Sequence, residues 1–137
     1  MQDNRPRNGD GARPNEGRDD EPGGLTVDVA DERGARILRM SGELDFAVAP
    51  DLLPSVPEFV AGAAGLVLDL TAVTFFDSAG VRLVDRLARE CGRTGARFSV
   101  VATPGTTLAR VLDIVGFGPP MVVPDLAAGL AAVRDPR

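Results

Sequence analysis

The sequence predicts an α/β fold with a mixed sheet of about five strands, an antiparallel hairpin at its start, a parallel core and about four helices. Two observations carry this prediction. Short apolar runs typical of buried strands alternate with segments in which apolar residues recur at helical spacing. Such alternation implies parallel pairing through right-handed crossovers, whereas the first two strands are joined by a loop that suits a hairpin.

The hairpin is predicted from two runs near the start of the chain. Residues 25–30 (LTVDVA) and 35–40 (ARILRM) have the composition of strands. The loop between them, residues 31–34, contains Asp and Gly, which suit a tight turn. Residues 47–64 are mostly apolar, but their prolines predict a kinked or broken helix; these are Pro50, Pro54 and Pro57.

The centre of the chain predicts a buried strand and then an amphipathic helix. Residues 66–70 (LVLDL) are almost continuously apolar, which is typical of a strand covered on both faces. A short hydrophobic step over residues 73–76 follows. From Ser78 the period is helical for about four turns, and Gly95 lies just past the end of this helix. The apolar face carries Gly80, Val84, Leu87 and Cys91, and the opposite face carries Arg82, Arg86, Arg89 and Arg93.

The arginine face of this helix has two interpretations. It is a partner surface, or it is a solvated face balanced by pairs such as Asp85 with Arg89 and Arg86 with Glu90. The second is favoured, because helix surfaces commonly carry such pairs. Cys91 falls on the apolar face, so we expect a small core residue and not a reactive thiol.

The last third of the chain predicts two more strands and two more helices. Residues 98–102 (FSVVA) have the pattern of a buried strand, and helical spacing follows over residues 108–115. Gly116 stands where a left-handed cap is expected. Residues 121–123 predict a short last strand. Asp125 is placed to cap a final helix, whose inward residues are Leu126, Leu130 and Val133.

The first 24 residues differ in composition from the remainder. Met1 and Ala12 are the only aliphatic residues among them, and most of the others are charged residues, Gly, Pro or Asn. Such a segment cannot bury enough apolar surface to offset the entropy of ordering its backbone. We therefore expect residues 1–24 to be a disordered tail and residues 25–137 to form one domain.

The composition excludes several functions. The 137 residues include 15 basic and 20 acidic side chains, giving a net charge of -5, and no histidine. Histidine-dependent nucleophiles and His-ligated zinc sites are therefore excluded, and the acidic balance argues against a nucleic-acid partner. The single cysteine, the lack of a signal peptide and the lack of a long apolar run predict a cytoplasmic protein without membrane association. We expect no cofactor and no metal.

Asp77 and Ser78 stand at the start of the central helix, where backbone amides lack intrahelical partners. One interpretation is that either residue is simply an N-cap, which stabilises the helix by about 1 kcal/mol. A second is that Ser78 is phosphorylated, because exposed amides and the positive end of the helix dipole favour a phosphate there. Arg82, one turn later, is a possible contact for that phosphate.

Three motifs in this order resemble the STAS domain, and within it the bacterial anti-sigma factor antagonists. The first is Ser-Gly-Glu-Leu-Asp at residues 41–45. The second combines Leu-Asp-Leu at 68–70 with Val-Thr-Phe-Phe-Asp-Ser-Ala-Gly at 73–80. The third is Leu-Asp-Ile-Val-Gly-Phe at 112–117. The resemblance covers nearly all of the chain after the tail.

The resemblance implies a phosphorylation switch and not an enzyme. In this family the serine after the motif's Asp, here Ser78, is the phosphoacceptor. The unmodified protein binds an anti-sigma factor that is also a serine kinase of the histidine-kinase-like ATPase fold, and so frees a sigma factor; a serine phosphatase resets the switch. The resemblance places Glu43, Asp45, Asp77, Ser78, Ala79, Gly80 and Val81 at the docking surface. Pro54 and Pro57 depart from the family's regular first helix.

Two other functions stay open. The chain is a STAS adaptor in a signalling or lipid-transport assembly, with Ser78 serving only as a cap, or it is a hydrolase with Ser78 as nucleophile. The hydrolase is disfavoured, because the chain has no histidine base and no Gly-x-Ser-x-Gly elbow, and Asp77 is poorly placed to take the serine proton. Glu43 and Asp45 resemble half of a cation site, but no third ligand is evident.

Overall fold

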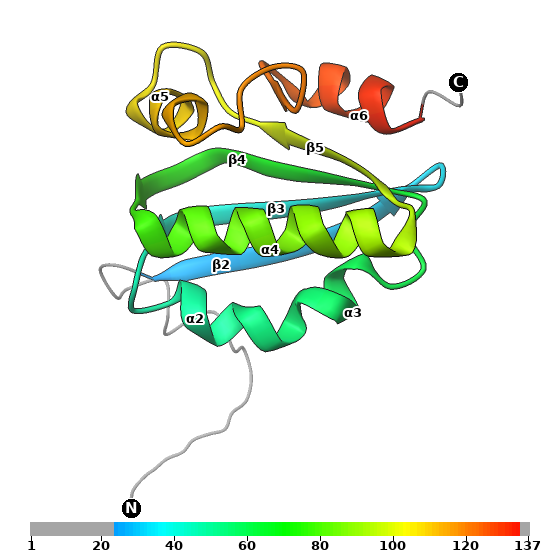
Figure 1. Ribbon diagram of the computed structural model, residues 1–137, viewed down its shortest axis with the longest axis horizontal. Coiled ribbons are helices and arrows are strands. Elements are labelled where there is room, and N and C mark those ends of the chain that lie inside the picture. The colour runs from blue at the N-terminus through cyan, green and yellow to red at the C-terminus, as the bar shows by residue number, and fades with distance from the viewer. Residues whose placement is uncertain (1–23, 135–137) are drawn as a thin grey trace, which may run out of the picture.

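A five-stranded mixed sheet forms the centre of the molecule, as predicted (Figure 1). The structure is a computed structural model that describes residues 24–134. The strands lie side by side in chain order, with β2 antiparallel to β3 and every later pair parallel. The predicted tail lies outside the described residues, except Gly24, whose carbonyl oxygen accepts a hydrogen bond from the Glu43 N–H (3.2 Å).

The opening hairpin has longer strands and a shorter turn than the sequence predicts. Strand β2 spans Leu25–Glu32 and β3 spans Ala35–Leu44. Because Glu32 pairs with Ala35, only Arg33 and Gly34 remain in the turn. Both have positive φ angles, 53° and 86°, as a two-residue turn with the twist of the strands requires.

The predicted broken helix is confirmed, and its prolines mark the breaks. Helix α2 spans Ala49–Leu52, the 3₁₀ turn η2 spans Leu53–Ser55 and helix α3 spans Val56–Val60. In each of these three segments the second residue is a proline. Proline is tolerated there because the amide it lacks would have no partner in the helix.

The central strand continues beyond the buried run that predicted it. Strand β4 spans Gly65–Phe76, so the predicted hydrophobic step belongs to the second half of this strand, where Val73 and Phe76 are half-buried against the core and the other residues are exposed. Its pairing with β3 shifts twice, first beyond Asp69. At that shift the buried Asp69 carboxylate accepts hydrogen bonds from the Thr71 N–H (3.0 Å) and hydroxyl (2.8 Å), and it pairs with Arg39 (3.0 Å). These bonds satisfy a carboxylate that burial would otherwise destabilise.

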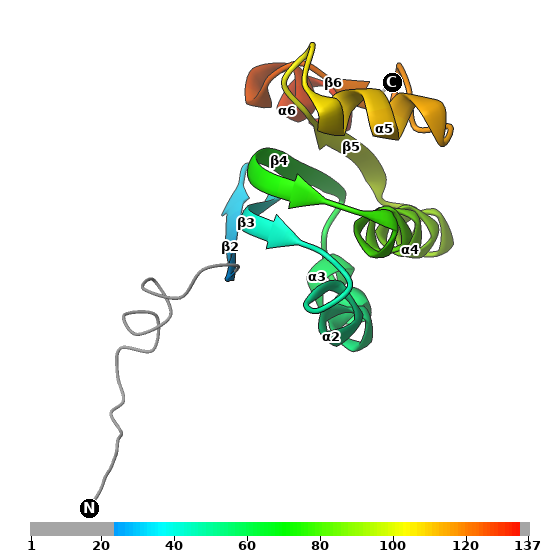
Figure 2. The ribbon, with the colours of Figure 1, turned by 90° about the vertical axis from the view of Figure 1, so that its left-hand side faces the viewer.

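Helix α4 (Ser78–Thr94) covers one face of the sheet together with α2 and α3 (Figure 2). Its apolar face is as predicted, and Gly95 follows with a φ of 85°. Cys91 is buried in this core, and desolvation, aided by the charge of Glu90, raises the pKa of its thiol to about 11. On the solvent side Asp85 pairs with Arg89 as predicted, whereas Glu90 pairs with Arg93 and not with Arg86.

The remaining elements agree with the prediction to within a residue or two. They are β5 (Arg97–Val101), α5 (Thr107–Ile114), β6 (Val122–Val123) and α6 (Leu126–Arg134). Gly116 has a φ of 103° at the end of α5, and the Asp125 carboxylate accepts the Ala128 N–H (2.9 Å). Within residues 24–134 no helix has the length and apolar character needed to cross a membrane.

Helix α6 packs against the sheet through a second, smaller core. Val133 of α6 lies there with Ala35, Val67 and Val101. Gly65, the first residue of β4, permits this close approach, because a Cβ atom built on it would stand 2.7 Å from the Cβ of Val133. A side chain at this position would displace the end of α6.

We expect Gly65→Ala to lower the free energy of unfolding by about 1–3 kcal/mol through this overpacking. Gly92→Ala is the matched control, because Gly92 lies in α4 with nothing within 4 Å of a built Cβ. It should raise stability by about 0.5–1 kcal/mol through helix propensity. Urea denaturation of the three proteins measures both effects, and equal midpoints would contradict the packing assigned to α6.

Candidate functional site

The predicted docking residues come together where the carboxyl ends of β3 and β4 meet. The last pair in the register of these strands is Leu44 with Phe76. After Leu44 the chain turns into α2, and after Phe76 it enters α4 at once, so both helices start at this end of the sheet (Figure 1). Ligands of open α/β sheets are generally bound at the carboxyl ends of the strands.

Asp77 is the N-cap of α4. Its backbone is extended (φ −126°, ψ −167°), and its Oδ1 accepts a hydrogen bond from the Ala79 N–H (2.9 Å). Its Oδ2 accepts a second hydrogen bond from the N–H of Phe46 (3.1 Å), in the turn between β3 and α2. One carboxylate therefore caps the helix and fixes the neighbouring turn beside it.

Ser78 is the first residue of α4 and is not its cap. The N-cap interpretation, which allowed either residue, is therefore confirmed for Asp77 and wrong for Ser78. The Ser78 residue is exposed, and no hydrogen bond of its hydroxyl is found to any residue from 24 to 134. The hydroxyl thus lies at the positive end of a 17-residue helix. Within residues 24–134 the fold does not depend on a hydrogen bond from it.

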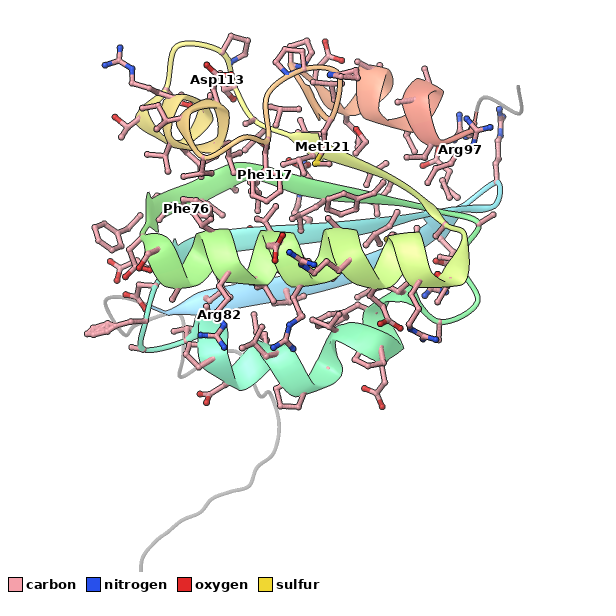
Figure 3. The ribbon with its side chains drawn as sticks, in the orientation of Figure 1. Phe76, Arg82, Arg97, Asp113, Phe117 and Met121 are labelled. Carbon is pink, nitrogen blue, oxygen red and sulfur yellow. The ribbon has the colours of Figure 1, made fainter. Side chains whose placement is uncertain are left out.

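Arg82 lies beside Ser78, as its spacing of one helical turn predicts. Both residues line a pocket of about 380 Å³, together with Pro50, Leu53 and Ala79. The Arg82 side chain is on the side of α4 that faces α2 (Figure 3). It is exposed, and it forms no ion pair with the residues that the structure describes.

Glu43 and Asp45 occupy the end of β3 and the turn that follows. Asp45 organises the turn: its Oδ1 accepts the Ala47 N–H (3.0 Å), and its carbonyl oxygen accepts the Ala49 N–H (2.7 Å). Glu43 is half-buried, and its carboxylate has no hydrogen bond or ion pair within the described chain. No group of three potential metal ligands occurs among residues 24–134.

The three residues after Ser78 differ in exposure. Ala79 and Val81 are half-buried, whereas Gly80 is buried. A Cβ atom built on Gly80 would stand 2.6 Å from the Phe76 ring and 2.9 Å from the Leu44 carbonyl oxygen. Gly80 therefore allows the start of α4 to lie directly on the ends of β3 and β4. This contact places Ser78 next to the carboxyl ends of these two strands.

Two exposed aromatic residues at this end were not predicted. Phe46 has 69% of its surface exposed and Phe75 has 52%. Phe46 adjoins Asp77 through its backbone hydrogen bond, and Phe75 is the partner of Glu43 in the sheet register. Neither ring has a clear signal in the sequence, because Phe46 precedes Ala47 and Val48 and Phe75 lies in the hydrophobic step at residues 73–76, and aromatic residues beside apolar ones are normally assigned to the core.

We expect Asp77→Ala to lower the free energy of unfolding by about 1–2 kcal/mol, because two backbone amides lose their acceptor. Asp77→Asn, which keeps one acceptor oxygen, should have a smaller effect. Ser78→Ala is the matched control and should change stability by less than about 0.5 kcal/mol. Urea denaturation distinguishes these variants, and an equal loss in Asp77→Ala and Ser78→Ala would show that the serine has a capping role.

Comparison with known proteins gives one consistent result. The family model described as the STAS domain matches residues 26–127. The anti-sigma-F factor antagonist RsfB of Mycobacterium tuberculosis is 34% identical over 96 residues, which are 69% of this chain and 77% of RsfB. The crystal structure of an anti-sigma factor antagonist from Mycobacterium paratuberculosis is 33% identical, with a TM-score of 0.70, and the match covers 84% of this chain and 98% of that one.

The fold is also that of unphosphorylated SpoIIAA, an anti-sigma factor antagonist, with a TM-score of 0.67 at 21% identity over 80% of this chain and 96% of SpoIIAA. The sheet topology, the matched residues and these relatives agree with the family that the motifs at residues 41–45 and 73–80 suggested. The chain belongs to the STAS domain family.

Proposed function

We infer that this protein is an anti-sigma factor antagonist: it binds an anti-sigma factor when Ser78 is unmodified and leaves it when Ser78 is phosphorylated. Its relatives support the first half, since RsfB and the Mycobacterium paratuberculosis protein are both described as anti-sigma factor antagonists. The observation that supports the second half is the exposed, uncommitted Ser78 hydroxyl at the start of α4.

The site favours phosphorylation of Ser78 for a chemical reason. A phosphate there adds a charge of about −1.5 to −2 next to backbone amides that lack helical partners. The Asp77 carboxylate already satisfies the Ala79 N–H, so modification of Ser78 does not remove the helix cap. The kinase substrate is thus a hydroxyl that the folded domain does not need.

The same phosphate disfavours binding of a protein partner. A dianion in a packed interface must lose its water, which costs much more than the loss of a neutral hydroxyl's water. Glu43, Asp45 and Asp77 add like charge at the same end of the sheet. Phosphorylation is therefore expected to weaken docking at this surface.

The family resemblance extends the proposal to the other members of the switch. The anti-sigma factor would itself be the serine kinase, with an ATPase of the histidine-kinase-like fold, and a serine phosphatase would reverse its action. The protein would then act in the cytoplasm, where sigma factors act. In this proposal the chain is a regulatory substrate and not an enzyme.

The two alternative functions fit the site less well. The adaptor hypothesis uses Ser78 only as a cap, whereas Asp77 has that role. The hydrolase hypothesis needs a base for the serine proton, but both oxygens of the adjacent Asp77 accept backbone hydrogen bonds.

The proposal is tested with ATP and the anti-sigma factor kinases encoded in the same genome, each purified. We expect phosphate on Ser78 alone, and an affinity for the partner at least about tenfold lower after modification. Ser78→Ala should stay unmodified and bind. Thr74→Ala is the matched control, because Thr74 is also exposed and lies four residues earlier, and it should still be modified. Phosphate on another residue, or unchanged affinity, would overturn the switch.

Arg82 is expected to hold the phosphate once it is formed, because both residues line one pocket. Unmodified wild type and Arg82→Ala should therefore melt at the same temperature, whereas the phosphorylated wild type should be more stable than phosphorylated Arg82→Ala by about 0.3–1 kcal/mol. Arg86→Ala, an exposed arginine one turn further on, is the control. Equal melting of all phosphorylated forms would remove Arg82 from the site.

A further inference from the structure

Two exposed aromatic side chains border the acidic end of the sheet. We use the term aromatic–acidic patch for Phe46, Phe75, Glu43, Asp45 and Asp77, which the register and hydrogen bonds of this end bring together. Five large apolar residues are exposed among residues 24–134, and two of them belong to this patch. Exposed apolar surface rimmed by polar groups marks interaction sites more often than chance.

The fold does not use the ring of Phe46. The turn that contains it is held by backbone groups and carboxylates: the Phe46 N–H donates to Asp77, and the Ala47 N–H donates to Asp45. The ring itself remains 69% exposed. An alanine would keep every one of these hydrogen bonds, so the aromatic ring is not needed for this turn.

Phe75 borders a groove that is open to a partner. The groove has a volume of about 450 Å³ and lies between the end of β4 and the start of α5, where Thr107, Leu108 and Val111 line its other side. Phe75 stays 52% exposed beside it. The groove can therefore receive an apolar side chain, with the Phe75 ring forming part of its wall.

The charge of the patch selects the partner. It contains three carboxylates and no basic residue, and the Glu43 carboxylate has no ion pair within the described chain. A second copy of the chain would place like charges opposite one another, and the phosphates of a nucleic acid or an anionic membrane would be repelled. A protein surface with arginine or lysine side chains around apolar pockets fits both properties of the patch.

We propose that Phe46 and Phe75 are the apolar anchors by which this surface holds its protein partner: the Phe46 ring enters an apolar pocket of the partner, and the Phe75 ring forms the wall of the groove that receives an apolar side chain of the partner. The partner presents basic side chains around these apolar contacts. This inference rests on the proposed function, since the patch adjoins Ser78. Apolar anchors act only at close contact from which water is excluded. A hydrated phosphate on Ser78 would keep the two surfaces apart, so anchors of this kind would make the switch sensitive to modification.

The test measures binding of Phe46→Ala and Phe75→Ala to the same panel of purified anti-sigma factors, with anti-sigma-F factor of Mycobacterium tuberculosis included. Val29→Ala is the matched control, because Val29 is 53% exposed but lies on the edge strand β2. We expect each phenylalanine variant to bind at least about tenfold more weakly, and the control to bind as wild type does. Phe75→Leu retains an apolar wall for the groove, so its affinity for the partner should lie between those of Phe75→Ala and wild type. Melting curves confirm that each variant is folded.

The outcomes separate this inference from the proposed function. If wild type binds a partner and both alanine variants bind within about twofold of it, the anchors are refuted and the antagonist function stands. If wild type binds no member of the panel, both are refuted. Sedimentation of the free protein tests whether a second copy of the chain occupies the patch instead. A wild-type dimer that dissociates in Phe46→Ala would show that it does, and would refute the proposed partner. Association that speeds up with added salt would refute a basic partner surface.

Discussion

The Asp77 carboxylate holds the functional end of this molecule together. One oxygen caps helix α4, and the other accepts the N–H of Phe46, which lies 31 residues earlier in the chain. That second bond ties the turn after β3 directly to the start of α4, in addition to the packing of α2 against α4. Because of it, the acidic turn, the exposed aromatic ring and the Ser78 hydroxyl keep fixed positions relative to one another, and one partner surface can contact all of them.

Close packing below this carboxylate supplies the rest of the rigidity. Gly80 sits against the Phe76 ring and the Leu44 carbonyl oxygen, at the last paired residues of β4 and β3. The helix start is therefore supported directly by the sheet, and a hydroxyl on its first residue is displayed on a rigid element and not on a loop. Sites on rigid elements are positioned more accurately than sites on loops, which suits the recognition by a kinase and a docking partner that is proposed for Ser78.

Periodicity and caps allowed most of the fold to be predicted from the sequence. The arginine-striped helix, the proline-broken helix and the Asp125 cap are all local features, set by residues within one or two turns of each other. The second half of β4 was not predicted as strand, because its residues alternate in neither polarity nor burial and its pairing with β3 shifts register. A register shift depends on the facing strand, and it leaves little signal in the sequence of one strand.

For the site, the sequence predicted which residues lie together, but it did not predict which of Asp77 and Ser78 caps the helix and which remains free. Local spacing allows either Asp77 or Ser78 to cap α4, since both can accept an amide hydrogen bond. The extended backbone of Asp77 and its hydrogen bond from the Ala79 N–H distinguish them. The second bond of Asp77, from the Phe46 N–H, joins residues too far apart in sequence for any local pattern to reveal. The exposure of Phe46 and Phe75 is hidden for the same reason: an aromatic residue in an apolar motif is normally assigned to the core, and only the tertiary structure shows that these two rings are outside it.

Under the proposed function, this division of tasks would let Ser78 act as a switch without destabilising the fold. Were Ser78 the cap, its phosphorylation would change the helix terminus itself, and every modification cycle would alter stability by about 1 kcal/mol or more. With the cap on Asp77 and the hydroxyl on the next residue, a phosphate would change the charge and hydration of the surface while the bonds from Phe46 and Ala79 stay in place. Adjacent residues with separate roles, a structural one for Asp77 and a chemical one proposed for Ser78, therefore suit a reversible phosphorylation switch at a helix N-terminus.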